Sequence, residues 1–515
     1  MAPQRYTGRW LSSPAQLVLL VIAAKLAIVT ALVAVMDFTI DETYDVVMAR
    51  NLALAYHDHP PAAIWLIAAA VKLFGAENPL IVRLPTLLLS AAQSWMLYRL
   101  TALIFDAWSG LFAVVGLCLS PLFGFYLGAL AVTDGPLLFG LTGAALFLAR
   151  ALFGKDTNAR RDWLLAGLFF GLALLSKFSA ILIVPGVALF LLTVPSNRRV
   201  LLTPEPYLAA LVALAIFTPV IVWNLQNGLD AFLYQGGRAA IAGDLHLTRA
   251  LTHTGLLVAV LGPAVWLIQI AALAAALRAG PRQEGRWFFA MLAIVPIAFF
   301  LVLDVFGTAG DQGPHWLAPG YLFTFPLLGA AVAEWSARFP RTVRWTIGGL
   351  AGGVVALMLG FGAHIVTGWL QKVVPSITPS YDPLIADSTD WRRFRAALNE
   401  RGLLDSKQFV VVGRYFFCFK AQLVLKDSIP VVCLDDENPI ALSLWRDDAA
   451  LIGREAIIVT TWWRARQSVQ DIEGKFERTE PMEPVWIESY GRPVMRIDLV
   501  HGENLQGRIL KQPVD

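Results

Sequence analysis

The sequence predicts an α-helical polytopic membrane protein of about 11 transmembrane helices, with a small C-terminal extracytoplasmic α/β domain. Hydrophobic residues make up 57% of the 515 residues and charged residues only 15%, and the mean hydropathy is +0.61. Long apolar runs stop after residue 370, where charge rises. A soluble protein of this composition would expose too much apolar surface. The net charge of +3 does not suggest a nucleic-acid partner.

Apolar runs of about 20 residues are long enough to cross a bilayer core of about 30 Å. The sequence contains eleven such runs, at 14–36, 84–105, 108–128, 133–151, 163–177, 178–194, 206–225, 252–277, 287–305, 316–336 and 344–369. The first run is too long for the core of a signal peptide, so we expect a retained anchor. The division at Lys177 matters most, because one kinked helix over 163–194 would remove a crossing and invert everything downstream.

Basic residues test the orientation, because loops rich in Lys and Arg stay in the cytoplasm. With the N-terminus inside, the even-numbered loops carry all the basic clusters, namely Arg150, Lys155, Arg160, Arg161, Arg198, Arg199, Arg278, Arg282, Arg286, Arg338, Arg341 and Arg344. This agreement supports eleven spans and places the C-terminus outside.

Two domains are expected. Residues 1–370 form the transmembrane domain, with a long first outer loop at about 37–83, and residues 371–515 form the soluble domain. In the soluble domain, β-rich stretches at 409–412, 430–434, 456–461 and 494–499 accompany helical patterns near 390–402 and 416–426. Cys418 and Cys433 lie there and could pair, although a disulfide requires a geometry that sequence does not show.

The first outer loop begins with a pair of acids, Asp41 and Glu42. A structural interpretation is a solvated helix start with Asp41 as the N-cap and acids in the first turn. A functional interpretation is a general base held close to the bilayer. Further along the loop, Tyr56-His57-Asp58-His59-Pro60-Pro61 predicts a stiff polar turn, because proline fixes φ and removes donors. The turn could be purely structural, contact a substrate, or bind a metal through His57, Asp58 and His59, with Asp41 as a further possible ligand.

Three more polar groups fall on the outer side. Asp134 opens the fourth span, where a carboxylate is costly unless it is hydrated, paired or functional. Lys177 lies at the outer end of the fifth span, where it could snorkel to the interface or bind a phosphate. The others are Trp223-Asn224, followed by Tyr234, Gln235 and Arg238, and Gly313-Pro314-His315-Trp316. Their aromatics could form an interfacial belt, while amides and an arginine also suit sugar and phosphate.

The five polar groups share one side of the membrane under an orientation that other residues determine. The span interiors are almost free of charge, whereas a proton- or ion-coupled transporter more often carries ionisable residues near the midplane. This distribution favours chemistry at the outer surface over transport.

These motifs, in this order, resemble those of glycosyltransferase family 39, a family of GT-C membrane enzymes. The family includes protein O-mannosyltransferases and the bacterial aminoarabinose and galacturonate transferases. The resemblance is carried by Asp41-Glu42-Thr43-Tyr44, Tyr56-His57-Asp58-His59-Pro60-Pro61, Arg83-Leu84-Pro85, Thr133-Asp134-Gly135-Pro136, Leu175-Ser176-Lys177-Phe178, Trp223-Asn224 and His315-Trp316-Leu317-Ala318-Pro319.

The resemblance implies a GT-C-like fold and transfer of a sugar from a polyprenyl-phosphate donor to an acceptor outside the cytoplasm, usually with inversion. It implies that Asp41 is the base. Lys177 and Arg238 are our candidates for binding the phosphate, and His57, His59 and His315 for hydrogen bonds to sugar or phosphate. Asp58 and Asp134 are expected to orient the acceptor or hold a cation. Glu42, Tyr44 and Asn224 complete the predicted substrate-binding set. No cofactor is certain, and a divalent metal ion is possible.

Two departures from the family pattern narrow the expectation. Aminoarabinose transferases tend to have Glu-Lys-Pro-Pro where this chain has Asp58-His59-Pro60-Pro61, which weakens that assignment. The tail looks unlike the β-trefoil of eukaryotic mannosyltransferases. It is more similar to bacterial tails at Val411-Val412-Gly413-Arg414-Tyr415 and Ser443-Leu444-Trp445. We therefore expect a bacterial inner-membrane enzyme that faces the periplasm and modifies an envelope glycolipid or glycan of the lipopolysaccharide type. The alternatives are a protein acceptor, or a transporter of lipid-linked glycans without chemistry.

Overall fold

The computed structural model describes residues 13–155, 158–241, 245–308, 313–404, 407–412, 415–426, 428–433, 448–461, 472 and 474–509. Contacts divide the chain into two compact units. The first comprises Met1–Ala31, Ala53–Leu66 and Arg83–Ala356, and the second comprises Leu32–Leu52, Ile67–Val82 and Leu357–Asp515. This division differs from the predicted boundary at residue 370, because two segments near and within the first outer loop join the C-terminal unit.

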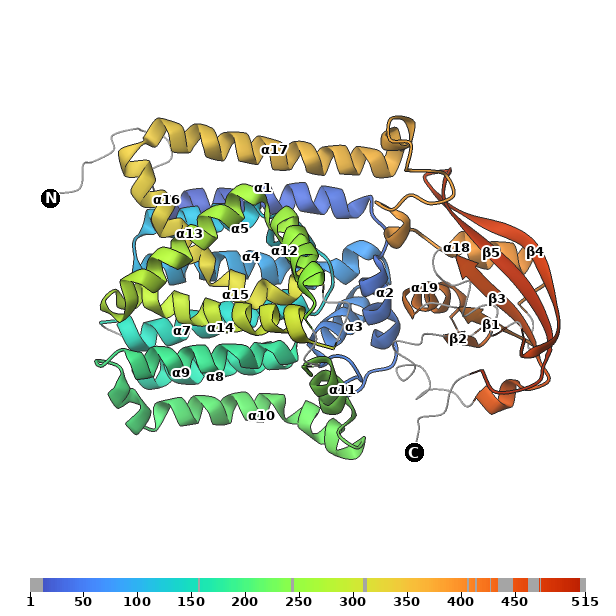
Figure 1. Cartoon of the computed structure of the whole chain (residues 1–515), viewed down its shortest axis with the longest axis horizontal. Helices are drawn as coiled ribbons and strands as arrows, with labels where there is room; N and C mark the ends of the chain where they lie inside the picture. The colour runs from blue at the N-terminus through green and yellow to red at the C-terminus, as the bar shows by residue number, and fades with distance from the viewer. Residues whose placement is uncertain are drawn as a thin grey trace. The chain divides into compact units, whose positions relative to one another are not determined.

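The first unit is a helical bundle whose long helices mostly run side by side (Figure 1). Its longer helices are α1 (Pro14–Ala34), α4 (Pro79–Ile104), α5 (Ala107–Leu119), α7 (Asp134–Phe153), α8 (Ala159–Leu174), α9 (Ile183–Thr193), α10 (Glu205–Gln226), α12 (Leu247–Leu261), α13 (Pro263–Ala279), α14 (Glu284–Phe306), α16 (Thr324–Arg338) and α17 (Pro340–Thr367). Shorter pieces are α3 (Ala62–Phe74), η1 (Pro121–Tyr126), α6 (Leu127–Ala129), η2 (Phe178–Leu182), η3 (Arg198–Leu202), α11 (Asp230–Arg238), η4 (Gly280–Arg282), η5 (Pro314–Leu317) and α15 (Ala318–Leu322). Helices α1, α3, α4 and α17 continue into the second unit.

Within the described residues, seven helices are long and apolar enough to cross a membrane, or nine if each of two bent helix pairs counts as one span. The chain is therefore a multi-pass membrane protein, and the predicted count of eleven spans is not confirmed. The sequence predicts that the apolar run over 163–194 forms two helices that meet at Lys177. The structure agrees that the helix stops there, because α8 ends at Leu174, Lys177 is extended, and η2 begins at Phe178. The two resulting pieces are shorter than a standard span.

The predicted span at 252–277 is wrong as a continuous helix. Gly262 adopts φ +90°, which L side chains rarely do, and the run divides there into α12 and α13. The predicted spans at 108–128 and 316–336 are also bent, by 86° between α5 and the segment from Pro121 and by 59° between Pro314–Leu322 and α16. Proline and glycine break the helices in apolar runs that hydropathy alone joins.

Small residues bring α7, α8 and α10 close together. A Cβ added at Gly140 of α7 would lie 2.7 Å from the backbone nitrogen of Ala173 in α8, and one at Gly171 of α8 would lie 2.8 Å from Cβ of Ile216 in α10. Both distances are shorter than real Cβ contacts, so neither glycine tolerates a side chain without movement. Close backbone approach through small residues is the usual way for membrane helices to pack. This packing sets the positions of the helix ends that carry Asp134 and Lys177.

The second unit contains a five-stranded sheet with the order β2-β1-β3-β5-β4. Its strands are β1 (Gln408–Val412), β2 (Val431–Cys433), β3 (Glu455–Thr461), β4 (Phe476–Ser489) and β5 (Arg492–Leu505), and its helices are α2 (Ile40–Ala49), η6 (Trp369–Lys372), η7 (Ala386–Ser388), α18 (Arg392–Glu400), α19 (Tyr415–Leu425) and η8 (Asp448–Leu451). β1 pairs with β2 and β3 in parallel, whereas β5 pairs antiparallel with β3 and β4. The predicted β-rich stretches and helical patterns of the tail are confirmed.

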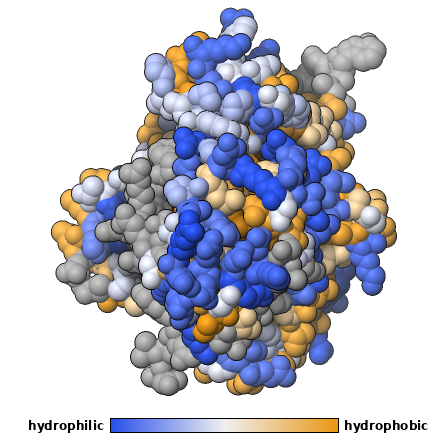
Figure 2. Space-filling view, turned by 90° about the vertical axis from the view of Figure 1, so that its right-hand side faces the viewer, coloured by the Kyte–Doolittle hydropathy of each residue, from blue (hydrophilic) through white to orange (hydrophobic). Residues whose placement is uncertain are grey.

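The sequence does not predict β4. This strand lies at the edge of the sheet, contains Pro481 and Pro484, and shows register shifts against β5. Prolines are tolerated on an edge strand because one side of the strand needs no hydrogen-bond partner. In the sequence, however, a proline within a run argues against a strand, so β4 is not predicted. Figure 2 views the side on which β4 and β5 lie in Figure 1, and hydrophilic residues gather over the middle of that face, with hydrophobic residues toward its margins. A hydrophilic face agrees with a soluble domain.

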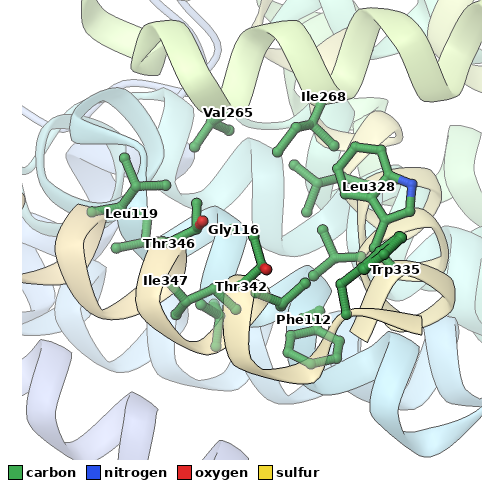
Figure 3. Close-up of a pocket in the computed structure, with 15 residues that line it drawn as sticks. Phe112, Gly116, Leu119, Val265, Ile268, Leu328, Trp335, Thr342, Thr346 and Ile347 are labelled. Atoms are coloured by element: carbon green, nitrogen blue, oxygen red, sulfur yellow. The ribbon is translucent and has the colours of Figure 1, made fainter. Parts of the chain in front are cut away.

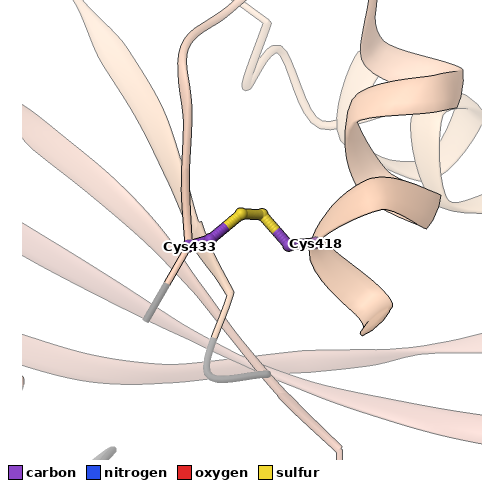
Figure 4. The surroundings of a disulfide bond; sticks show 2 residues. All are labelled: Cys418 and Cys433. Atoms are coloured by element: carbon purple, nitrogen blue, oxygen red, sulfur yellow. A yellow bond between two sulfur atoms is a disulfide. The ribbon is translucent and has the colours of Figure 1, made fainter. Parts of the chain in front are cut away.

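Cys418 of α19 and Cys433 of β2 form a disulfide with a Cα–Cα distance of 5.6 Å (Figure 4). The pairing that the sequence left open is therefore present. Residues 413, 414 and 443–445, which carry part of the resemblance to bacterial tails, lie outside the described residues.

Candidate active site

The turn at residues 56–61 is held by its own backbone and by the start of α3. The backbone N–H of Tyr56 donates to the carbonyl of His59 (3.0 Å), and the hydroxyl of Tyr56 accepts from the N–H of Ala53 (3.1 Å). Just after the two prolines, the N–H of Ala62 donates to the carbonyl of Leu175 (2.9 Å). This last bond joins the turn to the segment that contains Ser176 and Lys177, although the two are far apart in sequence.

The segment after Trp223 reverses the chain and starts α11. Gly228 and Leu229 both adopt φ +65°, and glycine is the residue that takes this conformation at least cost. Asn224 is fully buried and both ends of its amide contact backbone: Nδ2 donates to the carbonyl of Val220 (2.9 Å), and Oδ1 accepts from the N–H of Phe232 (3.1 Å). These contacts fit a structural role, in which Asn224 fixes the angle between α10 and α11.

One face of α11 lies against the turn at residues 56–61. Asp230 accepts a hydrogen bond from Nδ1 of His57 (2.7 Å), and the ring of Tyr234 packs 4.2 Å from the ring of His57. The amide Nε2 of Gln235 donates to the carbonyl of Asp58 (2.7 Å). Because an ionised carboxylate only accepts, Nδ1 of His57 carries a proton. Its Nε2 is buried, with no hydrogen-bond partner among the residues that the structure describes.

Asp134 and Lys177 form an ion pair at the ends of α7 and α8. The ammonium of Lys177 contacts both carboxylate oxygens of Asp134, at 3.0 and 2.8 Å, and both side chains are largely buried. The adjacent residues join in the same way, because the hydroxyl of Ser176 donates to the carbonyl of Thr133. The sequence does not predict this pair, since the two residues are 43 positions apart. It explains how a carboxylate is accommodated at the start of a span.

Arg238 is held by aromatic rings instead of by an acid. Its guanidinium lies 4.5 Å from the ring centroid of Trp316 and 5.4 Å from that of Tyr234. No carboxylate in the described part of the chain pairs with it. The ring of His315, next to Trp316, lies 6.1 Å from that of Tyr126. Stacked rings fix the plane of a guanidinium and leave its N–H donors available for a phosphate or carboxylate.

His59, Asp134, Lys177, Arg238 and His315 lie close enough for their charges to interact. Burial lowers the pKa of His59; Asp58 opposes that change, while Lys177 and Arg238 reinforce it. His59 is therefore neutral near pH 7 and can both donate and accept a hydrogen bond. Four of the five polar groups recognised in the sequence thus meet in the first unit, and we call these five residues the polar cluster.

The remaining polar group belongs to the second unit. There, the side chain of Thr39 accepts from the backbone N–H of Glu42 (3.3 Å), and the carboxylate of Glu42 accepts from the N–H of Thr39 (2.9 Å). Thr39, and not Asp41, is therefore the N-cap of α2, in a capping box with Glu42. The ring of Tyr44 is buried against Phe419 (4.9 Å, edge to face). Asp41 lies in the first turn of α2 and is partly exposed, while these contacts give Glu42 and Tyr44 structural roles.

No group of three His, Cys, Asp or Glu side chains suited to a metal ion occurs among the described residues. Metal binding by Asp41, His57, Asp58 and His59 stays a prediction, and no step below depends on it. A cavity of about 440 Å³ lies elsewhere in the first unit, between α5, α13, α16 and α17 (Figure 3). Its lining is apolar apart from Thr342, Thr346 and the indole of Trp335. It contains none of the polar cluster, so we do not regard it as the active site.

The sequence offered a signal for one residue that the predictions missed. Asp230, Tyr234 and Arg238 are spaced i, i+4 and i+8, which places them on one face of a helix. A helix over this polar segment would have indicated that Asp230 acts together with the other two. Trp316, predicted only as part of a motif or an interfacial belt, contacts Arg238 directly.

Comparisons with known proteins agree with this architecture. A family model described as dolichyl-phosphate-mannose-protein mannosyltransferase matches residues 58–223. The chain is 28% identical over 330 residues to lipid A galacturonosyltransferase RgtD of Rhizobium johnstonii, covering 61% of this chain and 64% of that protein. It is 27% identical over 302 residues to lipopolysaccharide core galacturonosyltransferase RgtB of the same organism, covering 56% and 59%. The matches thus span less than two thirds of the length of either relative.

The fold is similar to that of ArnT from Cupriavidus metallidurans, in the crystal structure bound to undecaprenyl phosphate. The TM-score is 0.65, with 14% sequence identity over 94% of this chain and 97% of that chain. The family model, the two relatives and the similar fold agree with the resemblance carried by the motifs, which is to membrane glycosyltransferases of the GT-C class.

Proposed function

We propose that the chain transfers a sugar from a polyprenyl-phosphate donor to a lipid A or core-type glycolipid. By likeness to the two galacturonosyltransferases, the sugar is a hexuronic acid. The observation that carries this proposal is the polar cluster of the first unit, which gathers two cationic side chains, two histidines and a carboxylate. Such a set suits a phosphate and a sugar. Four of its residues, all except Arg238, belong to motifs that carry the resemblance to the family.

The donor's phosphate is the first requirement. A polyprenyl phosphate is already a good leaving group, so the reaction needs cations that stabilise the phosphate charge more than it needs a strong acid. Arg238 offers N–H donors in a plane fixed by Tyr234 and Trp316. Lys177 belongs to the same polar cluster, but its ammonium is paired with the carboxylate of Asp134. We therefore assign the direct phosphate contact to Arg238 and assign to the Lys177–Asp134 pair the task of holding the site's shape.

The sugar is the second requirement. The buried Nε2 of His57 is available for a hydrogen bond to a sugar hydroxyl. His59, neutral near pH 7, can donate or accept, and His315 lies in the same cluster. Hydrogen bonds of this kind fix the orientation of the sugar ring without adding net charge. Asp58 supports the turn that carries both histidines, through its carbonyl contact with Gln235.

Transfer itself needs a base. In the proposed reaction, the acceptor hydroxyl oxygen bonds to the anomeric carbon while the bond from that carbon to the phosphate oxygen breaks. The bonding electrons leave with polyprenyl phosphate, and the hydroxyl proton moves to the carboxylate of Asp41. Attack opposite the departing phosphate inverts the anomeric centre. Asp41 is assigned from its position in the sequence pattern after the first span, and a general base of this type contributes about 10²–10⁴-fold to the rate.

The same chemistry has a second possible acceptor. The matching family model is described as a protein mannosyltransferase, so a protein hydroxyl is the alternative to a glycolipid. We propose the bacterial inner membrane as the location, with transfer on the periplasmic side. The basic clusters in the even-numbered predicted loops and the disulfide in the second unit both support this orientation, since disulfides persist in oxidising compartments.

The test is mass spectrometry of lipids from cells that contain the native chain, no chain, or the Asp41→Asn variant at equal abundance. We expect the variant to accumulate a polyprenyl-phosphate sugar and to lack one sugar on an envelope glycolipid. Glu77→Gln is the matched control, because it makes the same carboxylate-to-amide change in the ion pair with Arg50, whose side chains are about a quarter exposed.

Each other outcome has a definite meaning. A protein that loses the mass of one sugar would identify the protein acceptor. Lipid pools that change without the chain but not in Asp41→Asn would remove Asp41 from the mechanism. Cells without the chain that retain every pool unchanged would contradict the proposed function, and an intact lipid-linked sugar that merely changes leaflet would identify a transporter.

A further inference from the structure

Helix α19 connects the acid-bearing helix α2 to the sheet of the second unit. It packs against α2 on one side and against β1 and β2 on another (Figure 1). The rings of Tyr44 and Phe419 pack nearly perpendicular to each other, with their centroids 4.9 Å apart. No motif links these segments, which are about 375 residues apart in sequence. The position of α2 therefore depends on a helix at the far end of the chain.

Lys420 of α19 lies beside the chain that enters α2. Its side chain is 1% exposed. The ammonium donates to the carbonyl of Phe38 and to that of Thr389 (2.9 Å). Phe38 immediately precedes Thr39, the N-cap of α2, and Asp37 lies within electrostatic range of Lys420. Lys420 thus fixes the backbone three residues before Asp41.

A buried ammonium is costly, so its location is informative. Lysine loses more hydration on burial than an apolar side chain of the same size, and core stability alone is often served as well by a well-packed apolar residue. Unlike an apolar side chain, a buried lysine requires hydrogen-bond acceptors at specific positions around its ammonium, and it therefore fixes the segments that carry those acceptors. Here the acceptors are two backbone carbonyls, one on the segment entering α2 and one close to α18. The two hydrogen bonds therefore fix the position of the segment that enters α2 relative to the segment before α18.

The disulfide fixes the other side of α19. Cys418, which lies two residues before Lys420, forms a disulfide with Cys433 of β2 (Figure 4). Positions i and i+2 of a helix point in different directions, so Cys418 reaches the sheet while Lys420 reaches the segment before α2. One short stretch of α19 therefore joins the sheet to the start of α2.

We propose that Lys420 is a positioning residue for Asp41, and that α19, fixed by the Cys418–Cys433 disulfide, is the strut through which it acts. This inference rests on the proposed role of Asp41 as the base. Displacing a reacting group by about 1 Å can cost about 100-fold in rate. The C-terminal unit then contributes to catalysis by holding the base, in addition to any contact that it makes with the acceptor.

The test compares Lys420→Met with Lys426→Met in the purified full-length chain. Lys426 follows the same helix and is exposed, so its variant removes the same charge without removing a buried contact. Transfer is measured with a polyprenyl-phosphate uronic acid and lipid A, and hydrogen–deuterium exchange is measured on the peptide covering residues 37–49. In Lys420→Met we expect kcat to fall about 100-fold, KM for the donor to stay within about twofold, and exchange in residues 40–49 to become faster. Lys426→Met should match the native chain in all three.

Hydrogen–deuterium exchange tests the role of α19 as a strut, whereas transfer activity tests the proposed function. Faster exchange in Lys420→Met, in a native chain that shows no transfer with any donor, would contradict the proposed function and leave the strut intact. Unchanged exchange in residues 40–49 would overturn the strut, whatever happens to the rate. A rise in KM with unchanged kcat would also overturn it, because that result would assign Lys420 to donor binding.

A second measurement keeps the inference falsifiable if Lys420→Met does not fold. Reduction of the disulfide in the native chain should speed exchange in both α19 and α2 and lower kcat. Cys118→Ala, which removes the free thiol of the first unit, should respond to the reductant exactly as the native chain does. A reduced chain with unaltered exchange in α2 would show that α19 does not hold that helix.

Discussion

The two units hold their acids in different ways. In the first unit, Asp134 and Asp230 are each bound by a side chain from another motif, Lys177 and His57. In the second unit, the helix that carries Asp41 is held through backbone groups, by the Thr39–Glu42 capping box and by Lys420. The bundle thus builds its site from pairs of side chains, whereas the C-terminal unit sets the orientation of a whole helix.

This difference predicts how each region fails. Removing one member of a buried pair leaves the other charge without a partner, and the folded state loses stability. Removing a contact to a carbonyl lets a helix move, and the rate falls before the stability does. The following predictions test the first kind of construction, in order of decreasing size.

The largest effect is expected from Lys177→Met. It leaves the carboxylate of Asp134 buried without its partner, which should cost about 3–5 kcal/mol of the free energy of unfolding. Thermal unfolding in detergent, followed by tryptophan fluorescence, measures the loss. The double variant Lys177→Met with Asp134→Leu should regain most of the stability. Equal losses in the single and double variants would mean that the ion pair is not the source of the effect.

Next in size is Asp230→Ala, which removes the acceptor that orients His57. A hydrogen bond to a charged group contributes about 1.5–3 kcal/mol, so kcat/KM should fall about 10- to 100-fold. Asp230→Asn, which retains an acceptor oxygen, should lose less. Asp498→Ala, in an ion pair that is nearly half exposed, is the control. If Asp230→Asn lost as much as Asp230→Ala, charge and not orientation would be the contribution of Asp230.

Arg238→Lys should have a smaller effect. Lysine keeps the charge but loses the planar group that stacks on Trp316 and Tyr234, which corresponds to about 0.5–2 kcal/mol. We expect KM for the polyprenyl-phosphate donor to rise by about 2- to 30-fold with little change in kcat. Arg161→Lys, in a more exposed position, should leave both constants unchanged. A fall in kcat alone would assign Arg238 to the transition state only.

The sequence predicted features that depend on neighbouring residues, and it missed those that depend on contacts with distant parts of the chain. The long helices α1, α10 and α14 follow apolar runs closely, because hydropathy reports a helix that lies in lipid. The division of 252–277 at Gly262 escaped prediction, since one glycine in an apolar run changes backbone conformation without changing hydropathy. β4 escaped because its prolines and charges are compatible only with an edge position, which sequence alone does not assign.

The candidate site shows the same limit. Residue types within each short motif predicted His59, Asp134, Lys177, Arg238 and His315 as site residues, and the structure brings them together. The partners within the site were not predictable motif by motif, because the Lys177–Asp134 pair and the His57–Asp230 pair each join segments that only the fold brings together. Asn224, predicted to bind substrate, instead contacts backbone at both ends of its amide. An amide beside a helix end suits either role.

The smallest effect concerns pH. Burial holds the pKa of His59 below its ordinary value of 6.5, so the folded chain binds fewer protons there than the unfolded chain does. Its contribution to stability is complete above about pH 6.5 and is lost as the pH falls from there toward the lowered pKa. His59→Gln should therefore show a shallower fall in melting temperature between pH 7.5 and pH 5.5 than the native chain. Parallel slopes in the two proteins would mean that other groups produce the acid sensitivity.

The attachment of α2 to α19 also bears on how the protein is made. Thr39 leaves the ribosome some 380 residues before Lys420, and contacts between such distant segments form late. A nascent chain can insert its helices and pair Asp134 with Lys177 long before α19 exists. Helix α2, which carries Asp41, can reach its final position only when synthesis is nearly complete and the disulfide has formed. We therefore expect a truncated or reduced chain to insert into the membrane but to lack the proposed transfer activity.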